Sequence, residues 1–144
     1  MKTETATLAL GCFWEPDIYF SKLKGVVKTR VGYSGGKKKN PSYHNLDDHT
    51  ETVEITFDPK IISFEKLLKH FWKEHDPTIQ QATQYKSAIF YQNEEQKKIA
   101  EKSKKELEKN LGREVVTEIN KVGVFYPAEE YHQKYLQKGK GRVC

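Results

Sequence analysis

The chain has 144 residues, 36% of them hydrophobic, and a formal net charge of +5 at neutral pH. This length allows one domain with a substantial core, and no apolar run reaches the roughly 18 residues that a bilayer crossing needs. We therefore expect a soluble single domain over residues 1–144, with no membrane partner. The densest basic run, 37–39, is short and no aromatic-basic RNA-binding motif accompanies it, so we also expect no nucleic-acid partner.

Cysteine and histidine usage limits the compartment and the metal chemistry. The N-terminus leads directly into a short strand-like segment without a secretory signal pattern, which indicates a cytoplasmic protein. Cys12 and Cys144 lie near opposite ends of the chain and do not form a secreted disulfide framework; in a reducing compartment such cysteines are more often catalytic or inert. The histidines lack ligand spacing and no C-x-x-C pair occurs, so we predict no metal site among His44, His49, His70, His75 and His132.

The first half of the chain predicts three strands and one helix. An apolar strand over 6–10 is followed by a helix whose first turn contains Pro16, where the missing N–H donor costs little. Alternating polar and apolar residues predict strands over 27–33 and 52–57, each with one buried face. The aperiodic stretch 34–50 between them predicts a long loop, and loops of this length are usually functional or mobile.

The second half predicts helices and strands in alternation. Ser63 suits an N-cap, and apolar residues with helical spacing follow it at Phe64, Leu67, Leu68, Phe71 and Trp72. The apolar run 87–91 predicts a strand that is covered on both faces. A Lys- and Glu-rich helix follows from an Asn93 cap, and weaker patterns predict a strand over 115–119 and a last short helix over 128–137.

This order of elements predicts an α+β fold. Strand, helix, strand, strand, helix, strand is the split βαβ plan of ferredoxin-like folds, a two-layer core whose helices pack on one face of the sheet. A further helix and strand follow toward the C-terminus. Two glycines and two basic residues in 139–144 predict a flexible tail over about 138–144.

Cys12 lies where the first strand gives way to a helix, in Gly11-Cys12-Phe13-Trp14. Unpaired backbone N–H groups and the helix dipole favour a thiolate there, so the position suits a nucleophile. A lone cysteine in a soluble domain is also commonly a small buried hydrophobe. Helix geometry alone leaves both interpretations open.

The motifs around and beyond Cys12 resemble the peptide methionine sulfoxide reductases of the A type. The resemblance extends over roughly residues 5 to 137, and its motifs lie at 11–14, 31–36, 40–43, 57–59, 75–78, 83–89 and 125–133. Several spaced motifs in the right order are far more specific than one tetrapeptide. The resemblance therefore favours a nucleophilic Cys12 over an inert one.

Reducing a sulfoxide needs a soft nucleophile, a proton donor for the oxygen and a wall that admits the methyl group. The resemblance implies that Cys12 attacks as thiolate and becomes a sulfenic acid, while methionine leaves. It also implies that the rings of Phe13 and Trp14 form the pocket for the substrate methyl. Both rings would otherwise be ordinary core residues.

Three further residues match family positions around the sulfoxide oxygen. Glu51 matches the glutamate that protonates the oxygen, a role that requires burial to raise its pKa; the alternative is a solvated charge at the start of a strand. Tyr43 and Tyr85 match tyrosines that hydrogen-bond the oxygen, and each would otherwise be a half-buried tyrosine. The loop between Tyr43 and Glu51 and the loop over 79–82 are both shorter than in the family. The family has an aspartate in the second loop, where this chain offers only Gln80 and Gln81.

The resemblance also implies how the cysteine is recycled. We expect Cys144 to resolve the sulfenic acid on Cys12 as an intramolecular disulfide that thioredoxin reduces, although an idle Cys144, with reduction by external thiols, is the alternative. No prosthetic group is expected; the reductant is external, thioredoxin or dithiothreitol. The expected protein is thus a cytoplasmic, monomeric oxidoreductase acting on methionine-S-sulfoxide, free or in peptides and proteins. A non-catalytic sulfoxide-binding module and a peroxide-reducing thiol enzyme are the alternative functions.

Overall fold

The computed structural model describes residues 2–133. Its first elements are β1 (Glu4–Leu10), α1 (Trp14–Ser21), β2 (Val26–Ser34) and β3 (Thr50–Phe57). They are followed by α2 (Phe64–Lys73), the short 3-10 helix η1 (Thr83–Tyr85), β4 (Ser87–Tyr91) and α3 (Glu94–Leu111). The described part ends with β5 (Glu118–Lys121), β6 (Tyr126–Pro127) and the 3-10 helix η2 (Glu130–His132).

The described strands form one sheet in the order β5-β4-β1-β3-β2-β6. β3 lies between β1 and β2 and is antiparallel to both, while β1 lies between β3 and β4 and is antiparallel to both. This interleaving is the split βαβ arrangement, so the predicted α+β fold is confirmed. β5 adds to β4 in parallel after α3, and β6 pairs with the other edge at β2.

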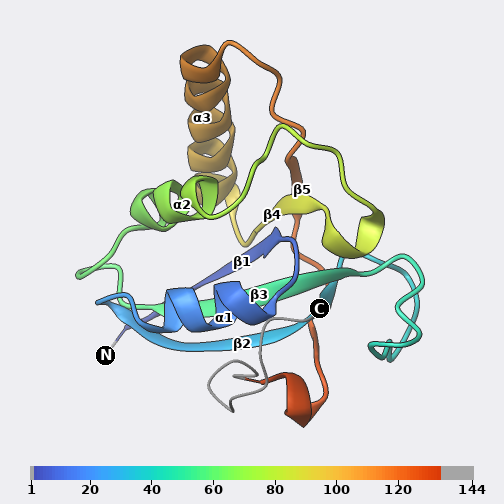
Figure 1. The fold of residues 1–144 in the computed structure, drawn as a ribbon. Helices are drawn as coiled ribbons and strands as arrows, with labels where there is room; N and C mark the ends of the chain where they lie inside the picture. The colour runs from blue at the N-terminus through green and yellow to red at the C-terminus, as the bar shows by residue number, and fades with distance from the viewer. Residues whose placement is uncertain (1, 134–144) are drawn as a thin grey trace.

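The three α-helices of residues 2–133 pack against one face of the sheet (Figure 1). On that face Leu8 of β1 lies opposite Val53 of β3 and Ile89 of β4, which places three buried aliphatic residues side by side. α1 lies across β2 and β3, whereas α2 and α3 pack against each other beside β1 and β4. The core therefore sits beneath the helices, and the start of α1 is fixed at the end of the central strand β1.

The helix ends follow the local sequence signals. The Ser63 side chain accepts a hydrogen bond from the Lys66 N–H at 3.0 Å and caps α2. Asn93 caps α3 through the Gln96 N–H at 2.9 Å, although the Gln96 side chain accepts from the Gln92 N–H and not from that of Asn93. The predicted capping box is therefore half formed. Within residues 2–133, the structure contains no helix that is both long and apolar enough to cross a membrane.

Three predictions of secondary structure differ from the structure. The strand predicted over 115–119 is observed as β5 at Glu118–Lys121, because the N–H groups of Val115 and Val116 bond the Glu108 side chain and the Pro77 carbonyl instead of a strand. A register shift between Val26 and Lys28 interrupts the pairing of β2 with β3, and Val27 is exposed instead of continuing the buried alternation. The predicted helix over 128–137 is wrong for its described part, because only the three residues of η2 form a helical turn there. Residues 134–137 of that prediction, and the tail over about 138–144, lie outside the described residues.

Candidate active site

Cys12 occupies the tight connection between the central strand β1 and α1. Gly11 before it has a φ of +95°, a backbone conformation that side-chain-bearing residues rarely adopt. Phe13 is the N-cap residue of α1, so Cys12 lies one residue before the cap. The fold thus places a half-buried cysteine near a helix N-terminus, as the sequence predicts.

Glu51 lies on β3 beside this connection and is completely buried. Its carboxyl group accepts hydrogen bonds from the backbone N–H of Phe13 at 3.2 Å and from the side-chain amide of Gln84 at 2.6 Å. Burial raises the pKa of Glu51 from 4.5 to about 7, while both hydrogen bonds act in the opposite direction. Glu51 can therefore carry a proton near neutral pH, the property that a general acid requires.

The phenol groups of Tyr43 and Tyr85 lie close enough for Tyr85 to influence the titration of Tyr43. Tyr43 belongs to the loop between β2 and β3, whereas Tyr85 belongs to η1. Burial, followed by the neighbouring Tyr85 phenol and the nearby Glu51, raises the pKa of Tyr43 well above its ordinary value. The Tyr43 phenol therefore remains a protonated donor near the buried carboxyl group.

The loop that carries Tyr43 is held at both of its sides. The backbone N–H of Tyr43 donates to one carboxyl oxygen of Glu129 at 3.1 Å. The other oxygen of Glu129 accepts from the Tyr33 hydroxyl on β2 at 2.7 Å. His49 is buried in the same loop, where its ring accepts from the Gly36 N–H at 3.2 Å. These contacts position Tyr43 in spite of the length of the loop.

Aromatic rings surround the start of α1. Phe13 and Trp14 are both buried, and the indole N–H of Trp14 donates to Nδ1 of His132 at 2.9 Å. The His132 ring lies 5.3 Å from the Phe13 ring and 4.5 Å from the Tyr43 ring, measured between centroids. η2 is thus packed against the residues that adjoin the nucleophile, and a largely apolar wall forms there.

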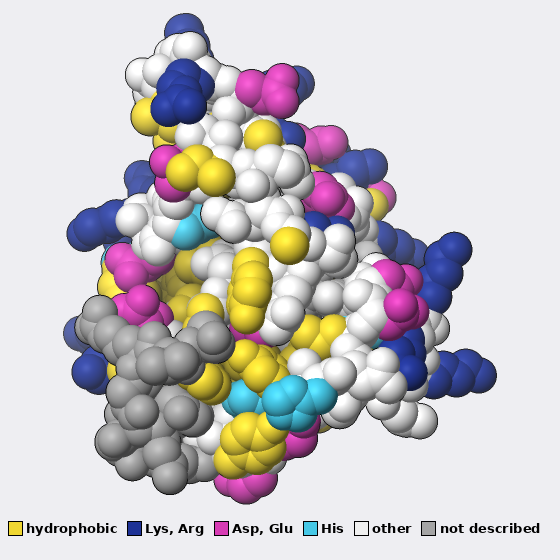
Figure 2. Space-filling model, turned by 45° about the vertical axis from the view of Figure 1, so that its right-hand side comes forward, with side chains coloured by type: hydrophobic (Ala, Val, Ile, Leu, Met, Phe, Trp, Pro, Cys, Tyr) yellow, Lys and Arg dark blue, Asp and Glu magenta, His cyan; other side chains and the backbone are white. Residues whose placement is uncertain are grey.

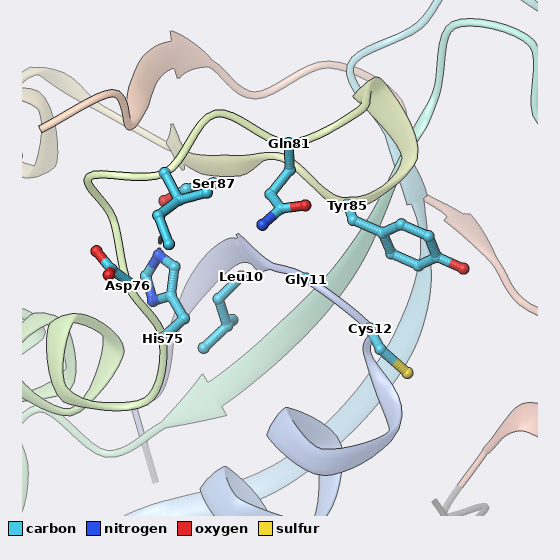
Figure 3. Close-up of a pocket in the computed structure, with 9 residues that line it drawn as sticks. Leu10, Gly11, Cys12, His75, Asp76, Gln81, Tyr85 and Ser87 are labelled. Atoms are coloured by element: carbon cyan, nitrogen blue, oxygen red, sulfur yellow. Dashed lines mark hydrogen bonds between the residues drawn. The ribbon is translucent and has the colours of Figure 1, made fainter. Parts of the chain in front are cut away.

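A pocket of about 390 Å³ opens beside Cys12. Figure 3 shows Cys12 and Tyr85 at one end of it, Leu10 and Gly11 along its base, and His75 and Asp76 at the other end. Figure 2 shows hydrophobic side chains gathered in the middle of one face, with Lys and Arg mostly around its periphery. A space of this size next to a cysteine suits a small ligand or part of a peptide.

The structure brings together the sequence-predicted residues Cys12, Phe13, Trp14, Glu51, Tyr43 and Tyr85. Cys144 lies outside the described residues. Sequence reasoning gave no role to Gln84, Glu129 and His132, although all three fall within the motifs that carry the resemblance. No group of three or more His, Cys, Asp or Glu residues suited to a metal occurs among residues 2–133.

The chain was compared with protein families, with curated proteins and with solved structures. The family model described as peptide methionine sulfoxide reductase matches residues 4–144. A peptide methionine sulfoxide reductase MsrA of Methanococcus maripaludis is 46% identical over 151 residues, covering 98% of this chain and 96% of the relative. The crystal structure of reduced Mxr1 from Saccharomyces cerevisiae superposes with a TM-score of 0.91 at 33% identity, covering 99% of this chain and 90% of that one.

The same yeast protein in complex with Trx2 superposes with a TM-score of 0.71 at 27% identity, covering 93% of this chain and 85% of that one. Fold, site and relatives together define a thiol-dependent oxidoreductase. The chain belongs to the peptide methionine sulfoxide reductase family, and it reduces methionine sulfoxide to methionine.

Proposed function

We propose that Cys12 is the nucleophile and Glu51 the proton donor of this reaction. The Cys12 thiolate attacks the sulfoxide group, and the sulfur–oxygen bond of the substrate breaks as the oxygen passes to the cysteine sulfur. One proton from Glu51 neutralises that oxygen, so the products are methionine and a cysteine sulfenic acid. The substrate sulfur is reduced by two electrons, and the Cys12 sulfur is oxidised by two.

The observation that carries this proposal is the link between Glu51 and the residue after the nucleophile. The hydrogen bond from the Phe13 N–H fixes the carboxyl group beside Cys12, and the pKa of about 7 leaves a proton available near neutral pH. A solvated glutamate would have lost that proton. Burial therefore supports the role of a general acid over that of a surface charge.

The aromatic residues would bind the oxygen of the sulfoxide and the methyl group on its sulfur. Tyr43 and Tyr85, whose phenol groups lie near each other, would turn their hydroxyl hydrogens toward the sulfoxide oxygen. Phe13 and Trp14 would receive the substrate methyl, since flat rings suit a polarizable sulfur and its methyl group. Such contacts distinguish the two configurations at sulfur, and the proposal assigns the S epimer, free or in peptides and proteins.

Recycling completes the proposal. Cys144 would attack the sulfenic acid on Cys12, releasing water and forming a disulfide, which thioredoxin would reduce by dithiol exchange. The yeast relative is described in complex with Trx2, which supports a thioredoxin partner. No prosthetic group is required, because the thiols carry all the electrons. We also propose that the protein acts as a monomer in the cytoplasm, where thiol reductants are present.

A turnover assay tests this function. The protein is incubated with dithiothreitol and each sulfoxide epimer of a blocked methionine, and methionine product is quantified. We expect product from the S epimer alone. Binding without product would instead indicate a non-catalytic sulfoxide-binding module, and consumption of peroxide but not sulfoxide would indicate a thiol peroxidase.

A further inference from the structure

The pocket beside Cys12 extends away from the groups that the reaction uses. Phe13, Trp14 and Glu51 do not line it, and its far end is formed by His75, Asp76 and Ser87. Its volume of about 390 Å³ lies within the range of small-ligand sites. The proposed reaction leaves this far end without a role.

The pocket is apolar along its base and at Ile79, whereas the residues of its far end are polar. Leu10 forms the base and is largely buried, and Ile79, on the loop between α2 and η1, is 49% exposed. The polar groups nearby are largely engaged with each other. His75 bonds the Phe71 carbonyl at 2.8 Å and the Ser87 hydroxyl at 2.7 Å, and that hydroxyl also bonds Thr117.

Charge at the pocket does not favour a basic or an acidic ligand. Asp76 is ionised near neutral pH, because hydrogen bonds from Thr78 lower its pKa. Its carboxylate would repel an acidic group, while nearby Arg113 offsets its attraction for a basic one. Burial lowers the pKa of His75, so that ring is neutral. An uncharged aliphatic side chain is the ligand that this lining accommodates best.

Gln81 supplies the polar contact. Its side chain extends into the pocket above the Leu10-Gly11 backbone (Figure 3), and it makes no hydrogen bond with any other residue of 2–133. An amide has both a donor and an acceptor, as a peptide main chain does. Gln81 is therefore placed to bond a substrate backbone that passes Cys12.

We propose that this pocket binds an aliphatic side chain two positions away from the oxidised methionine of a peptide substrate, with Gln81 bonding the main chain between them. In an extended peptide, residues two positions apart project to the same side and lie about 7 Å apart. The methionine side chain then enters the site at Cys12 while its second neighbour enters the pocket. This proposal rests on the proposed function and names a preferred class of peptide for it.

Blocked pentapeptides test the proposal. Each has a central methionine sulfoxide and alanine elsewhere, except for one leucine or glutamate at a chosen position. We expect leucine two positions before or after the sulfoxide to raise kcat/KM on the order of 10-fold over alanine. Leucine directly next to the sulfoxide should give no such advantage, and glutamate two positions away should lower kcat/KM.

Matched variants locate the effect. Ile79→Ser removes an exposed apolar wall, so the leucine advantage should fall below about 3-fold. Ile61→Ser alters an isoleucine of similar exposure, 54%, which does not line the pocket, and should retain the advantage. Equal kcat/KM for leucine and alanine peptides in the unaltered protein, with blocked methionine sulfoxide still reduced, would overturn the pocket assignment alone. Failure to reduce any sulfoxide would overturn the proposed function and the pocket with it.

Discussion

Two carboxyl groups, one beside the residue after Cys12 and one at the far end of the pocket that Cys12 lines, behave in opposite ways. Glu51 accepts two hydrogen bonds, from Phe13 and Gln84, and Asp76 accepts two from Thr78. The pKa of Glu51 is raised to about 7, whereas that of Asp76 is lowered. The number of hydrogen bonds is the same, so the difference comes from burial: Glu51 is fully buried and Asp76 is exposed.

This difference separates the functions of the two sides. A buried carboxyl group keeps its proton to near neutral pH and can deliver it to an oxygen, as a general acid must. An exposed carboxylate has lost its proton and can only repel or attract charge. The β3 side of the site therefore suits chemistry, and the side formed by His75 and Asp76 suits recognition.

The largest effect is expected at the nucleophile, on which both sides depend. Cys12→Ser should abolish turnover, because a hydroxyl is of similar size but a far poorer nucleophile near neutral pH. Methionine release from the S epimer measures the loss, and circular dichroism checks that the fold is retained. Substantial residual reduction by this variant would show that Cys12 does not attack the sulfoxide.

Matched amide variants test the two carboxyl groups directly. Glu51→Gln keeps the shape of the site but removes the proton, so kcat should fall by the roughly 10²–10⁴-fold typical of a general acid. Asp76→Asn should cost far less, since its charge takes no part in proton transfer. Steady-state rates with the same blocked sulfoxide provide the comparison. Equal losses in the two variants would contradict the division of roles.

Glu51→Gln should lower activity but raise the free energy of unfolding at alkaline pH. Folded Glu51 has a pKa of about 7 against 4.5 for the ordinary group, so the folded state loses stability as pH rises from about 4.5 through about 7. Glu51→Gln removes this loss. The change that the substitution makes in the free energy of unfolding should therefore be more favourable at pH 8 than at pH 4 by on the order of 3 kcal/mol. Urea unfolding at both pH values measures the difference, and a variant equally affected at both would argue against a buried proton.

A smaller effect is expected at Gln84. Its hydrogen bond favours the ionised form of Glu51, so Gln84→Leu should raise the pKa of Glu51 further and move the alkaline decline of kcat/KM to higher pH. Gln80→Leu is the control, because Gln80 is exposed and does not line the pocket at Cys12. A pH profile that is the same in both variants would remove Gln84 from the control of this proton.

Local sequence signals predicted most of the fold. The Ser63 cap, the α2 stripe and the β1–β4 arrangement follow from spacing that nearby residues set. Val27 departs from its predicted alternation because a bulge depends on how two strands pair, which the strand's own sequence does not specify. The predicted C-terminal helix failed over 128–133, where packing of His132 against Trp14 accompanies a short 3-10 turn.

The candidate site was predictable in part. Cys12, Glu51, Tyr43 and Tyr85 were found through motif resemblance, and the structure brings them together. Gln84 was adjacent to a predicted residue, but its bond to Glu51 joins positions 33 residues apart and emerges only from the fold. The resolving role of Cys144 stays a prediction. Treating Cys144→Ser protein with one equivalent of substrate should release methionine once without forming a disulfide, whereas normal thioredoxin-dependent turnover would contradict that role.

Direct titration of Glu51 tests the central claim, that burial holds a proton on this carboxyl group near neutral pH. Protein labelled with carbon-13 at its aspartate and glutamate side-chain carboxyls would be followed by nuclear magnetic resonance from acid to mildly alkaline pH. Spectra of Glu51→Gln and Asp76→Asn would assign the two signals. We predict a midpoint near 7 for Glu51 and one below the ordinary 3.8 for Asp76. A Glu51 midpoint near 4.5 would contradict the account, since no proton would then remain for the sulfoxide oxygen.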